Sequence, residues 1–275
     1  MEISAQDVVK LRKSTGAGMM DCKKALQEAN GNFDEAVKLI RERGKALANK
    51  RADRVAGEGV SLAKVSADEK KGILIVLNCE TDFVAKNADF IKLAEDIAGG
   101  ALEQSPDNLD ALKDLPIAGG KVSDRIADIT AAIGEKVDLS FYNKIEGEQV
   151  VAYIHPGSKV SSVVAFNQKL DNIQTGKDIA MQIAAMNPVA INKENVPQEI
   201  IDRELEIGRE QARLEGKAEA MLDKIAQGKL NKFFKENTLL EQQFIKDNKI
   251  TVQQYLQQAD KNLQVKAFLR YSLVD

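Results

Sequence analysis

The spacing of apolar residues changes near residue 56, and this change constrains the fold more than any other feature of the chain. Before it, apolar side chains recur every three or four residues, which is typical of amphipathic helices. After it, Val60, Leu62 and Val65 stand among polar residues at the spacing of a half-buried strand. The sequence therefore predicts a helical N-terminal unit followed by a mixed core, an α+β fold.

The N-terminal unit, residues 1–55, is expected to contain three short helices. Ser4 is placed to cap the first helix, which ends near Gly16, and Asn32 is placed to cap the third. From the second helix we expect these residues to face inward: Met19, Met20, Cys22, Ala25 and Leu26. The bundle should continue into an exposed connector with the basic residues Arg41, Arg43, Lys45, Lys50 and Arg51.

The core shows the same order of elements twice. Strand, turn, strand, loop and helix are predicted over residues 58–98 and again over 149–186. A helix over 123–133 and a strand over 137–145 lie between them, and a final strand is predicted over 265–273. Because the residues themselves differ, a duplicated α+β unit rests on the order of elements alone.

Two amphipathic helices that meet at Gly216 predict an antiparallel hairpin within the second unit. Such a hairpin is either a packing element or an exposed protrusion that forms an interface. The expected divisions are 1–55 for the bundle and connector, 56–146 for the first core subdomain, 147–186 with 232–275 for the second, and 187–231 for the inserted hairpin.

Composition and motifs argue against several classes of function. The formal net charge is −3, whereas a dedicated nucleic-acid binder usually has a strong basic excess. The two cysteines, Cys22 and Cys79, are too few for a disulfide framework and are expected as reduced thiols of a cytoplasmic protein. The chain shows no signal-peptide pattern and no apolar run near the ~20 residues of a membrane span. Without a phosphate loop, GxGxxG, HExxH or CxxC motif, we expect no cofactor, no metal and no enzymatic activity.

The segment from Asn78 to Val84 is the most suggestive for function. It follows an apolar strand directly and places Asp82 beside Phe83 in a short loop. A phenylalanine that a rigid scaffold presents to solvent could act as a wedge against the surface of another protein. The alternative is a core phenylalanine beside a capping Asp82, and spacing alone does not exclude it.

Other candidate residues have simpler interpretations. His155 precedes Pro-Gly, and without a second histidine it is better explained as a turn residue than as a metal ligand. A thiol enzyme could use Cys22 or Cys79, but both fit buried small apolar residues, and Cys22 has no histidine nearby in sequence. An RNA-associated factor could use the basic connector, which lacks interleaved aromatic residues.

Two motifs resemble the signature sequences of the bacterial elongation factor Ts family. The first is LRKSTGAGMMDCKKAL at residues 11–26, and the second is NCETDFVAK at residues 78–86. The resemblance extends to residues 132–135, to the surroundings of His155 and to the helical hairpin, so it covers nearly the whole chain. Each motif is specific, and both occur here in one chain.

Members of this family exchange guanine nucleotides on elongation factor Tu, the GTPase that delivers aminoacyl-tRNA to the ribosome. The resemblance implies a bundle like a ubiquitin-associated domain, two α+β core subdomains with antiparallel sheets, and a hairpin inserted in the second. In the family, the Asp-Phe pair enters the GTPase domain near its Mg²⁺ and phosphate site, and it matches Asp82 and Phe83. The other matching contact positions are Thr81, Val84, Met19, Met20, Lys23, Lys50, Arg51, Ile133, Gly134, His155, Phe244 and Ile245.

The resemblance thus implies one main partner, elongation factor Tu, in its GDP-bound and nucleotide-free forms. It implies no direct contact with nucleic acid or membrane, and it leaves open a homodimer of the complex. The chain departs from the family pattern at two places. Val76 stands where many members have an acid, and the chain ends in a strand without the C-terminal helix that some members add. These departures affect one hydrogen bond and one additional contact.

Overall fold

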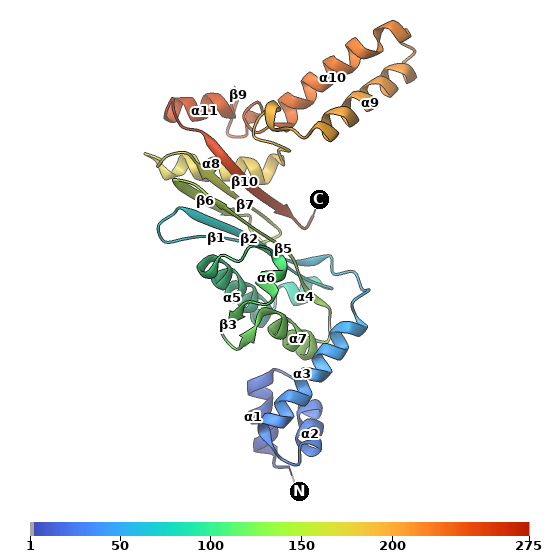
Figure 1. The fold of residues 1–275 in the computed structure, drawn as a ribbon, viewed down its shortest axis with the longest axis vertical. Helices are drawn as coiled ribbons and strands as arrows, with labels where there is room; N and C mark the ends of the chain where they lie inside the picture. The colour runs from blue at the N-terminus through green and yellow to red at the C-terminus, as the bar shows by residue number, and fades with distance from the viewer. Residues whose placement is uncertain (1–2, 275) are drawn as a thin grey trace.

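The computed structural model describes residues 3–274 and shows an elongated molecule (Figure 1). A helical bundle forms one end, a pair of small sheets with their helices forms the middle, and a helical hairpin projects from the other end. None of the helices in the described range combines the length and the apolarity that a membrane crossing requires. The predicted α+β class is confirmed.

The bundle consists of α1 (Ala5–Thr15), α2 (Met19–Glu28) and α3 (Phe33–Lys50). The predicted caps are confirmed. Ser4 accepts a hydrogen bond from the Asp7 N–H, Gly16 ends α1 with a left-handed φ of 71°, and the Asn32 side chain accepts from the Glu35 N–H at 3.1 Å. The buried residues of the bundle are Val8, Leu11, Ala17, Cys22, Ala25, Leu26, Ala29, Ala36 and Ile40.

The prediction that Met19 and Met20 face inward is wrong. Cys22, Ala25 and Leu26 define the inward face of α2. Met20 is turned away from that face and is 63% exposed. Met19 begins the helix, where it is only partly covered.

The predicted connector is exposed at Arg41, Lys45 and Lys50, but it is not a free tail, because α3 continues through it as a helix and packs against α7 (Val122–Ile133). The two helices cross closely at Gly44, where an added Cβ would lie 2.9 Å from the Ala127 carbonyl oxygen. Lys45 and Asp124 form an ion pair across the crossing at 2.8 Å. The basic half of α3 therefore joins the bundle to the core.

The first sheet contains β1 (Glu58–Val65), β2 (Lys71–Cys79) and β5 (Val137–Glu146), with antiparallel β2 in the centre. Helix α5 (Ala88–Gln104), which the Asn87 side chain caps, and α7 cover one face. The smaller elements of this half are α4 (Asp82–Ala85), α6 (Leu109–Lys113), β3 (Pro116–Ile117) and β4 (Gly120–Lys121).

The second sheet has the order β10-β7-β6, again antiparallel. Helix α8 packs on this sheet. In each sheet a later strand pairs with the second strand of a β-hairpin, as β5 does with β2 and β10 does with β7. The predicted duplication is therefore confirmed at the level of topology. The bounds are β6 (Gln149–Ile154), β7 (Val160–Phe166), α8 (Ile173–Met186), β8 (Gln243–Phe244), β9 (Asp247–Thr251), α11 (Val252–Ala259) and β10 (Val265–Ser272).

The two sheets pack face to face, which explains why β2 is apolar at nearly every position. Ile75 and Leu77 face the helices, whereas Leu74 and Val76 face the second sheet. Strands that are buried on both faces lose the alternation of polar and apolar residues. Val76 is fully buried between the sheets, where an unpaired carboxylate would be costly. The valine at this position therefore fits its surroundings.

The predicted hairpin is confirmed and consists of α9 (Gln198–Leu214) and α10 (Leu222–Asn237). The short 3₁₀ helices η1 (Lys193–Asn195) and η2 (Glu219–Met221) precede these two helices. Gly208 allows close packing, since an added Cβ there would lie 3.0 Å from the Ala226 Cα. The hairpin projects away from the sheets (Figure 1), so it is a protrusion and not an internal packing element.

Candidate functional site

Phe83 lies in α4, shortly after β2 ends at Cys79, and is 82% exposed. The alternative of a core phenylalanine is therefore wrong. The expected loop is instead the four-residue helix α4, and the Thr81 side chain, not Asp82, caps it. Asp82 pairs with Lys86 across one turn at 2.7 Å. This hydrogen bond lowers the pKa of Asp82, so the carboxylate stays ionised beside the exposed ring.

The residues that flank the exposed ring are buried. Val84 packs into the core of the first sheet, so its side chain is not exposed to a partner in this structure. Cys79 is fully buried and donates to the Thr81 carbonyl at 3.1 Å. Burial raises the pKa of Cys79 to about 12 and also raises the pKa of Cys22. Thiols in this state are poor nucleophiles, which speaks against a thiol enzyme.

Reciprocal hydrogen bonds of two carboxylates, which we call the clasp, join the segment just before the exposed ring to the turn after α7. Sequence reasoning did not single these two carboxylates out. The Glu80 carboxylate accepts a hydrogen bond from the Lys136 N–H at 2.7 Å. In return, the Glu135 carboxylate accepts from the Thr81 N–H at 3.1 Å and from the Thr81 hydroxyl at 3.0 Å. The only signal in the sequence was their position, since each directly adjoins a predicted contact segment.

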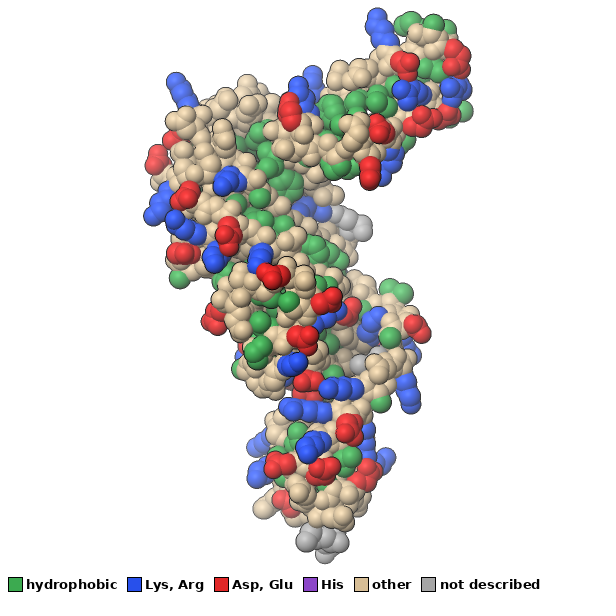
Figure 2. Space-filling model, in the orientation of Figure 1, with side chains coloured by type: hydrophobic (Ala, Val, Ile, Leu, Met, Phe, Trp, Pro, Cys, Tyr) green, Lys and Arg blue, Asp and Glu red, His purple; other side chains and the backbone are tan. Residues whose placement is uncertain are grey.

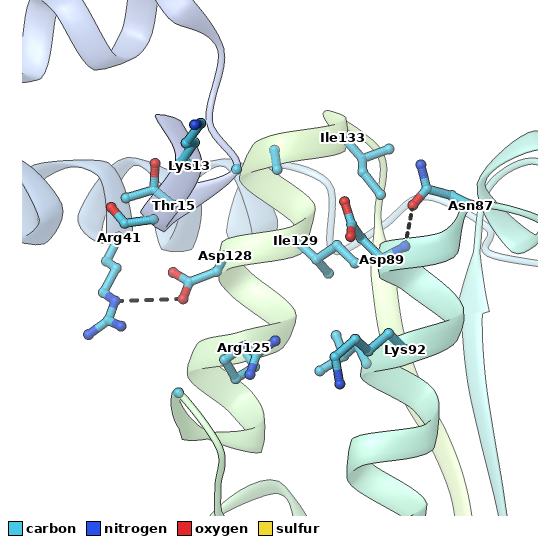
Figure 3. A pocket seen from close by; sticks show the side chains of 15 residues that line it. Lys13, Thr15, Arg41, Asn87, Asp89, Lys92, Arg125, Asp128, Ile129 and Ile133 are labelled. Atoms are coloured by element: carbon cyan, nitrogen blue, oxygen red, sulfur yellow. Dashed lines mark hydrogen bonds and ion pairs between the residues drawn. The ribbon is translucent and has the colours of Figure 1, made fainter. Parts of the chain in front are cut away.

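The clasp joins the segment of Phe83 to the end of α7, which holds the predicted contact residues Ile133 and Gly134. Gly134 ends the helix with a left-handed φ of 79°. Ile133 lines a groove of about 620 Å³ between the bundle and the core (Figure 3). Arg41 and Asp128 form an ion pair at 3.6 Å within this groove.

The exposed face of α2 carries three more predicted contact residues, Met19, Met20 and Lys23. The turn between α1 and α2 lies close to the end of α7, because an added Cβ at Gly16 would be 3.4 Å from the Ala132 Cβ. Lys50 is exposed at the end of α3.

Arg51 is engaged within the chain instead of being free for a partner. Its guanidinium pairs with Glu80 at 2.8 Å, and Arg54 pairs with the same carboxylate at 3.0 Å. The pKa of Glu80 is lowered to about 2, chiefly by the hydrogen bond from the Lys136 N–H and then by the two arginines. Glu80 is thus ionised throughout the physiological range.

A second surface brings together His155 and Ile245, which the sequence suggested separately. Both line a hollow of about 360 Å³ on the second sheet unit, with the further lining residues Tyr153, Val160, Met181, Ala184, Ala185 and Arg270. The Tyr153 hydroxyl lies 2.9 Å from the His155 Nδ1. Ile245 is 38% exposed.

Phe244 does not belong to this surface. It is only 3% exposed and stacks on Tyr255, with the ring centroids 4.1 Å apart. Its side chain fills the core of this unit and is not exposed to a partner in this structure. Its role is to support the neighbouring Ile245.

Buried polar groups on α8 hold Ile245 in place. The fully buried Gln182 accepts a hydrogen bond from the Ile245 N–H at 2.9 Å and donates to the Gln243 carbonyl at 3.1 Å. The buried Asp178 pairs with Lys246 at 2.7 Å. Buried hydrogen bonds of this kind fix a turn because their loss would leave unpaired polar groups.

The turn that follows His155 connects the surface around Phe83 to the hollow that His155 and Ile245 line. Ser158 in this turn accepts a hydrogen bond from the Ser61 N–H at 2.7 Å. Lys159 pairs with Glu58 at 2.7 Å. The Lys159 ammonium also contributes to the lowered pKa of Asp82, after the larger effect of Lys86. The turn therefore lies within electrostatic reach of the segment of Phe83.

The basic residues of α3 and its end form no free cationic patch. Acidic and basic side chains lie together at the waist between bundle and core (Figure 2). Four of the basic residues pair with acids, as Arg41–Asp128, Arg43–Glu28, Lys45–Asp124 and Arg51–Glu80. Within residues 3–274, no three His, Cys, Asp or Glu side chains gather as they would around a metal ion.

Comparison with known proteins gives a consistent result. A sequence model of the family described as "Elongation factor TS" matches residues 80–275. The chain is 51% identical over 276 residues to a protein named elongation factor Ts from Porphyromonas gingivalis, covering 99% of each chain. It is 52% identical over 272 residues to the protein of that name from Amoebophilus asiaticus, with 98% of each chain covered. It is 43% identical over 284 residues to that from Chlorobium phaeobacteroides, with 99% of each covered.

Proposed function

The chain belongs to the elongation factor Ts family, and from this membership we propose that it is the guanine-nucleotide exchange factor for elongation factor Tu. The observation that supports this proposal best is the exposed ring of Phe83 on a rigid support. A large apolar side chain held out of the core gains stability only when another surface covers it. Phe83 therefore fits a wedge that enters a partner.

In the proposed mechanism, Asp82 and Phe83 enter the GTPase domain near its Mg²⁺ and phosphate site. The clasp of Glu80 and Glu135 keeps the ring from folding back when it meets resistance. Ionised Asp82 brings negative charge toward the phosphates, and like charges repel. Both effects weaken the binding of GDP without any covalent chemistry on this chain.

The energetics require more than one side chain. Exchange rests on thermodynamic linkage. If this protein weakens the binding of nucleotide to elongation factor Tu by some factor, nucleotide weakens the binding of this protein to elongation factor Tu by the same factor. A ~10⁴-fold effect corresponds to about 5.5 kcal/mol of coupling. Burial of one aromatic side chain contributes about 1.5–3 kcal/mol, so Phe83 needs help from other contacts.

The remaining contacts in this proposal come from the other exposed surfaces. The α2 face with Met19, Met20 and Lys23 would bind the partner beside α7, together with Ile133. The hollow that His155 and Ile245 line would bind it on the second sheet unit. GTP then favours release, since it refills the nucleotide site and stabilises a partner conformation that this protein does not fit.

The test is the release of fluorescent GDP from elongation factor Tu of the same source. We expect this protein to accelerate release by orders of magnitude, with a rate that saturates as its concentration rises. Binding of the two proteins is measured in parallel by calorimetry. If they form a complex and release is no faster than without this protein, the proposed exchange function is wrong.

A further inference from the structure

Glu80 is the meeting point of three segments that are distant in sequence. Glu80 itself lies between β2 and α4. Its carboxylate accepts a hydrogen bond from the Lys136 N–H, in the turn after α7, at 2.7 Å. The same carboxylate accepts from Arg51 at 2.8 Å and from Arg54 at 3.0 Å, both just beyond α3. The Glu80 side chain is only 14% exposed, so water screens these bonds less than it would at an open surface.

The segment after α3 is held from a second direction as well. The Lys136 ammonium donates to the carbonyl of Ala52 at 2.6 Å and to that of Arg54 at 3.0 Å. Residues 51–54 therefore lie between the Glu80 carboxylate and the Lys136 side chain. Hydrogen bonds with a charged donor or acceptor are the stronger class, and four of them hold residues 51–54.

Helix α3 connects residues 51–54 to the bundle. Ala36 and Ile40 lie in the core of the bundle, and Gly44 packs on α7 in the same uninterrupted helix. The buried face of α2 packs on this helix within the bundle. A continuous path of backbone and short hydrogen bonds thus runs from the bundle through Arg51 and Glu80 to Phe83.

We propose that Glu80 is a positioning residue that fixes the direction of Phe83 relative to the bundle, so that the two engage elongation factor Tu as one rigid unit. This inference rests on the proposed exchange function. When two binding elements are held rigidly, the docking of one presents the other at a defined orientation. Without the carboxylate the bundle still docks, but Phe83 arrives with a spread of orientations.

The substitution that tests this is Glu80→Gln in the full chain, because the amide keeps the shape and removes the charge that Arg51 and Arg54 need. We expect the maximal rate of stimulated GDP release to fall at least tenfold. The concentration for half-maximal release should change less than threefold, since the exposed contacts of the bundle and of the second sheet unit are intact.

A cycle with Phe83→Ala separates positioning from general damage. If Glu80 acts through Phe83, the combined variant releases GDP within twofold of Phe83→Ala alone. A purely structural role would make the two losses multiply. The variant Arg51→Gln/Arg54→Gln, which leaves the bond between Glu80 and Lys136 intact, should give the same pattern and serves if Glu80→Gln does not fold.

The matched control is Asp124→Asn, which removes a different ion pair between α3 and the core, to Lys45 at 2.8 Å. It should exchange within twofold of the unchanged protein. Exchange by folded Glu80→Gln at the unchanged rate, or losses that multiply with those of Phe83→Ala, would overturn the positioning role. A failure of the unchanged protein to accelerate release would instead refute the exchange function itself.

Discussion

At the scale of single residues, Phe83 is an apolar side chain that the chain keeps out of its own core. Its neighbours Cys79 and Val84 are buried, so the backbone on either side is anchored while the ring stays in solvent. Because the ring makes few contacts within the chain, its removal should leave the fold intact. Any effect of removing it on exchange then reports on the partner.

We predict that Phe83→Ala slows stimulated GDP release by an order of magnitude or more at saturating concentration. The reason is the loss of about 1.5–3 kcal/mol of apolar burial in the complex, where each 1.4 kcal/mol is tenfold in rate. Stopped-flow fluorescence of labelled GDP measures it, with circular dichroism to check the fold. Leu214→Ala, at another apolar residue that is 86% exposed, is the control and should keep the maximal rate. Undiminished release by folded Phe83→Ala would refute the wedge.

Glu80 gives a second prediction at this scale, in the dependence of stability on pH. Its pKa is lowered to about 2 in the folded chain, from 4.5 in its ordinary state. The unfolded chain therefore binds a proton first as pH falls, so this contribution to stability is full above about pH 5 and is lost toward pH 2.

Glu80→Gln should accordingly lower the free energy of unfolding at pH 7 by about 1.5–3 kcal/mol, the range for hydrogen bonds to charged groups. The difference from the unchanged protein should shrink as the pH is lowered from 5 toward 2. Urea denaturation at several pH values measures this. The exposed Glu42→Gln on α3 is the control, and a difference that stays constant with pH would contradict the assignment.

At the scale of elements, α3 has two roles because it belongs to two cores. Its first half packs in the bundle through Ala36 and Ile40, and its second half packs on α7 at Gly44. The close crossing needs glycine, although glycine is a poor helix former. Packing at the crossing therefore outweighs local helix propensity.

We predict opposite effects of one substitution at two helical glycines. Gly228 on α10 has no atom within 4 Å of an added Cβ, so Gly228→Ala should raise the free energy of unfolding by about 0.5–1 kcal/mol through helix propensity. Gly44→Ala places its Cβ 2.9 Å from the Ala127 carbonyl oxygen and from the Ala131 Cβ. We expect it to lower stability by about 1–3 kcal/mol, as overpacking does. Urea denaturation of both variants decides; stabilisation by Gly44→Ala would show that the crossing has room to relax.

The elements themselves were largely predictable, because their signals are local. Ser4 and Asn32 cap helices as predicted, since a cap depends on its immediate neighbours. The end of α3 was not predictable. Its charges suggested a solvated connector, whereas they meet acids on α7 and at Glu80 that lie far away in sequence.

At the scale of the whole molecule, the exposed surfaces sit on units with separate cores. The bundle, the first sheet unit and the second sheet unit each have their own buried cluster. The face-to-face packing of the sheets and the crossing of α3 and α7 connect them. A partner that touches all three units can be gripped by one and distorted by another.

We predict that the triple variant Met19→Ala/Met20→Ala/Lys23→Ala weakens the affinity for elongation factor Tu at least tenfold and changes the maximal exchange rate less than threefold. These side chains are exposed on α2, away from Phe83. Their binding energy should therefore be the same before and during the release of nucleotide, so they raise the affinity and leave the maximal rate unchanged. Calorimetry and a titration of GDP release measure the two quantities. Val9→Ala, on the exposed side of α1, is the control. Unchanged affinity of the triple variant would exclude a docking role for this face.

The sequence by itself determined the longer helices and strands, their order and the repetition of the sheet unit, because capping, periodicity and turn residues act over a few positions. It did not determine which side chains would remain exposed. Phe83 and Phe244 both lie in short segments next to turns, yet Phe244 is covered by Tyr255 and Phe83 is left in solvent. Only the tertiary structure decided this, since burial depends on which distant segments pack against a residue.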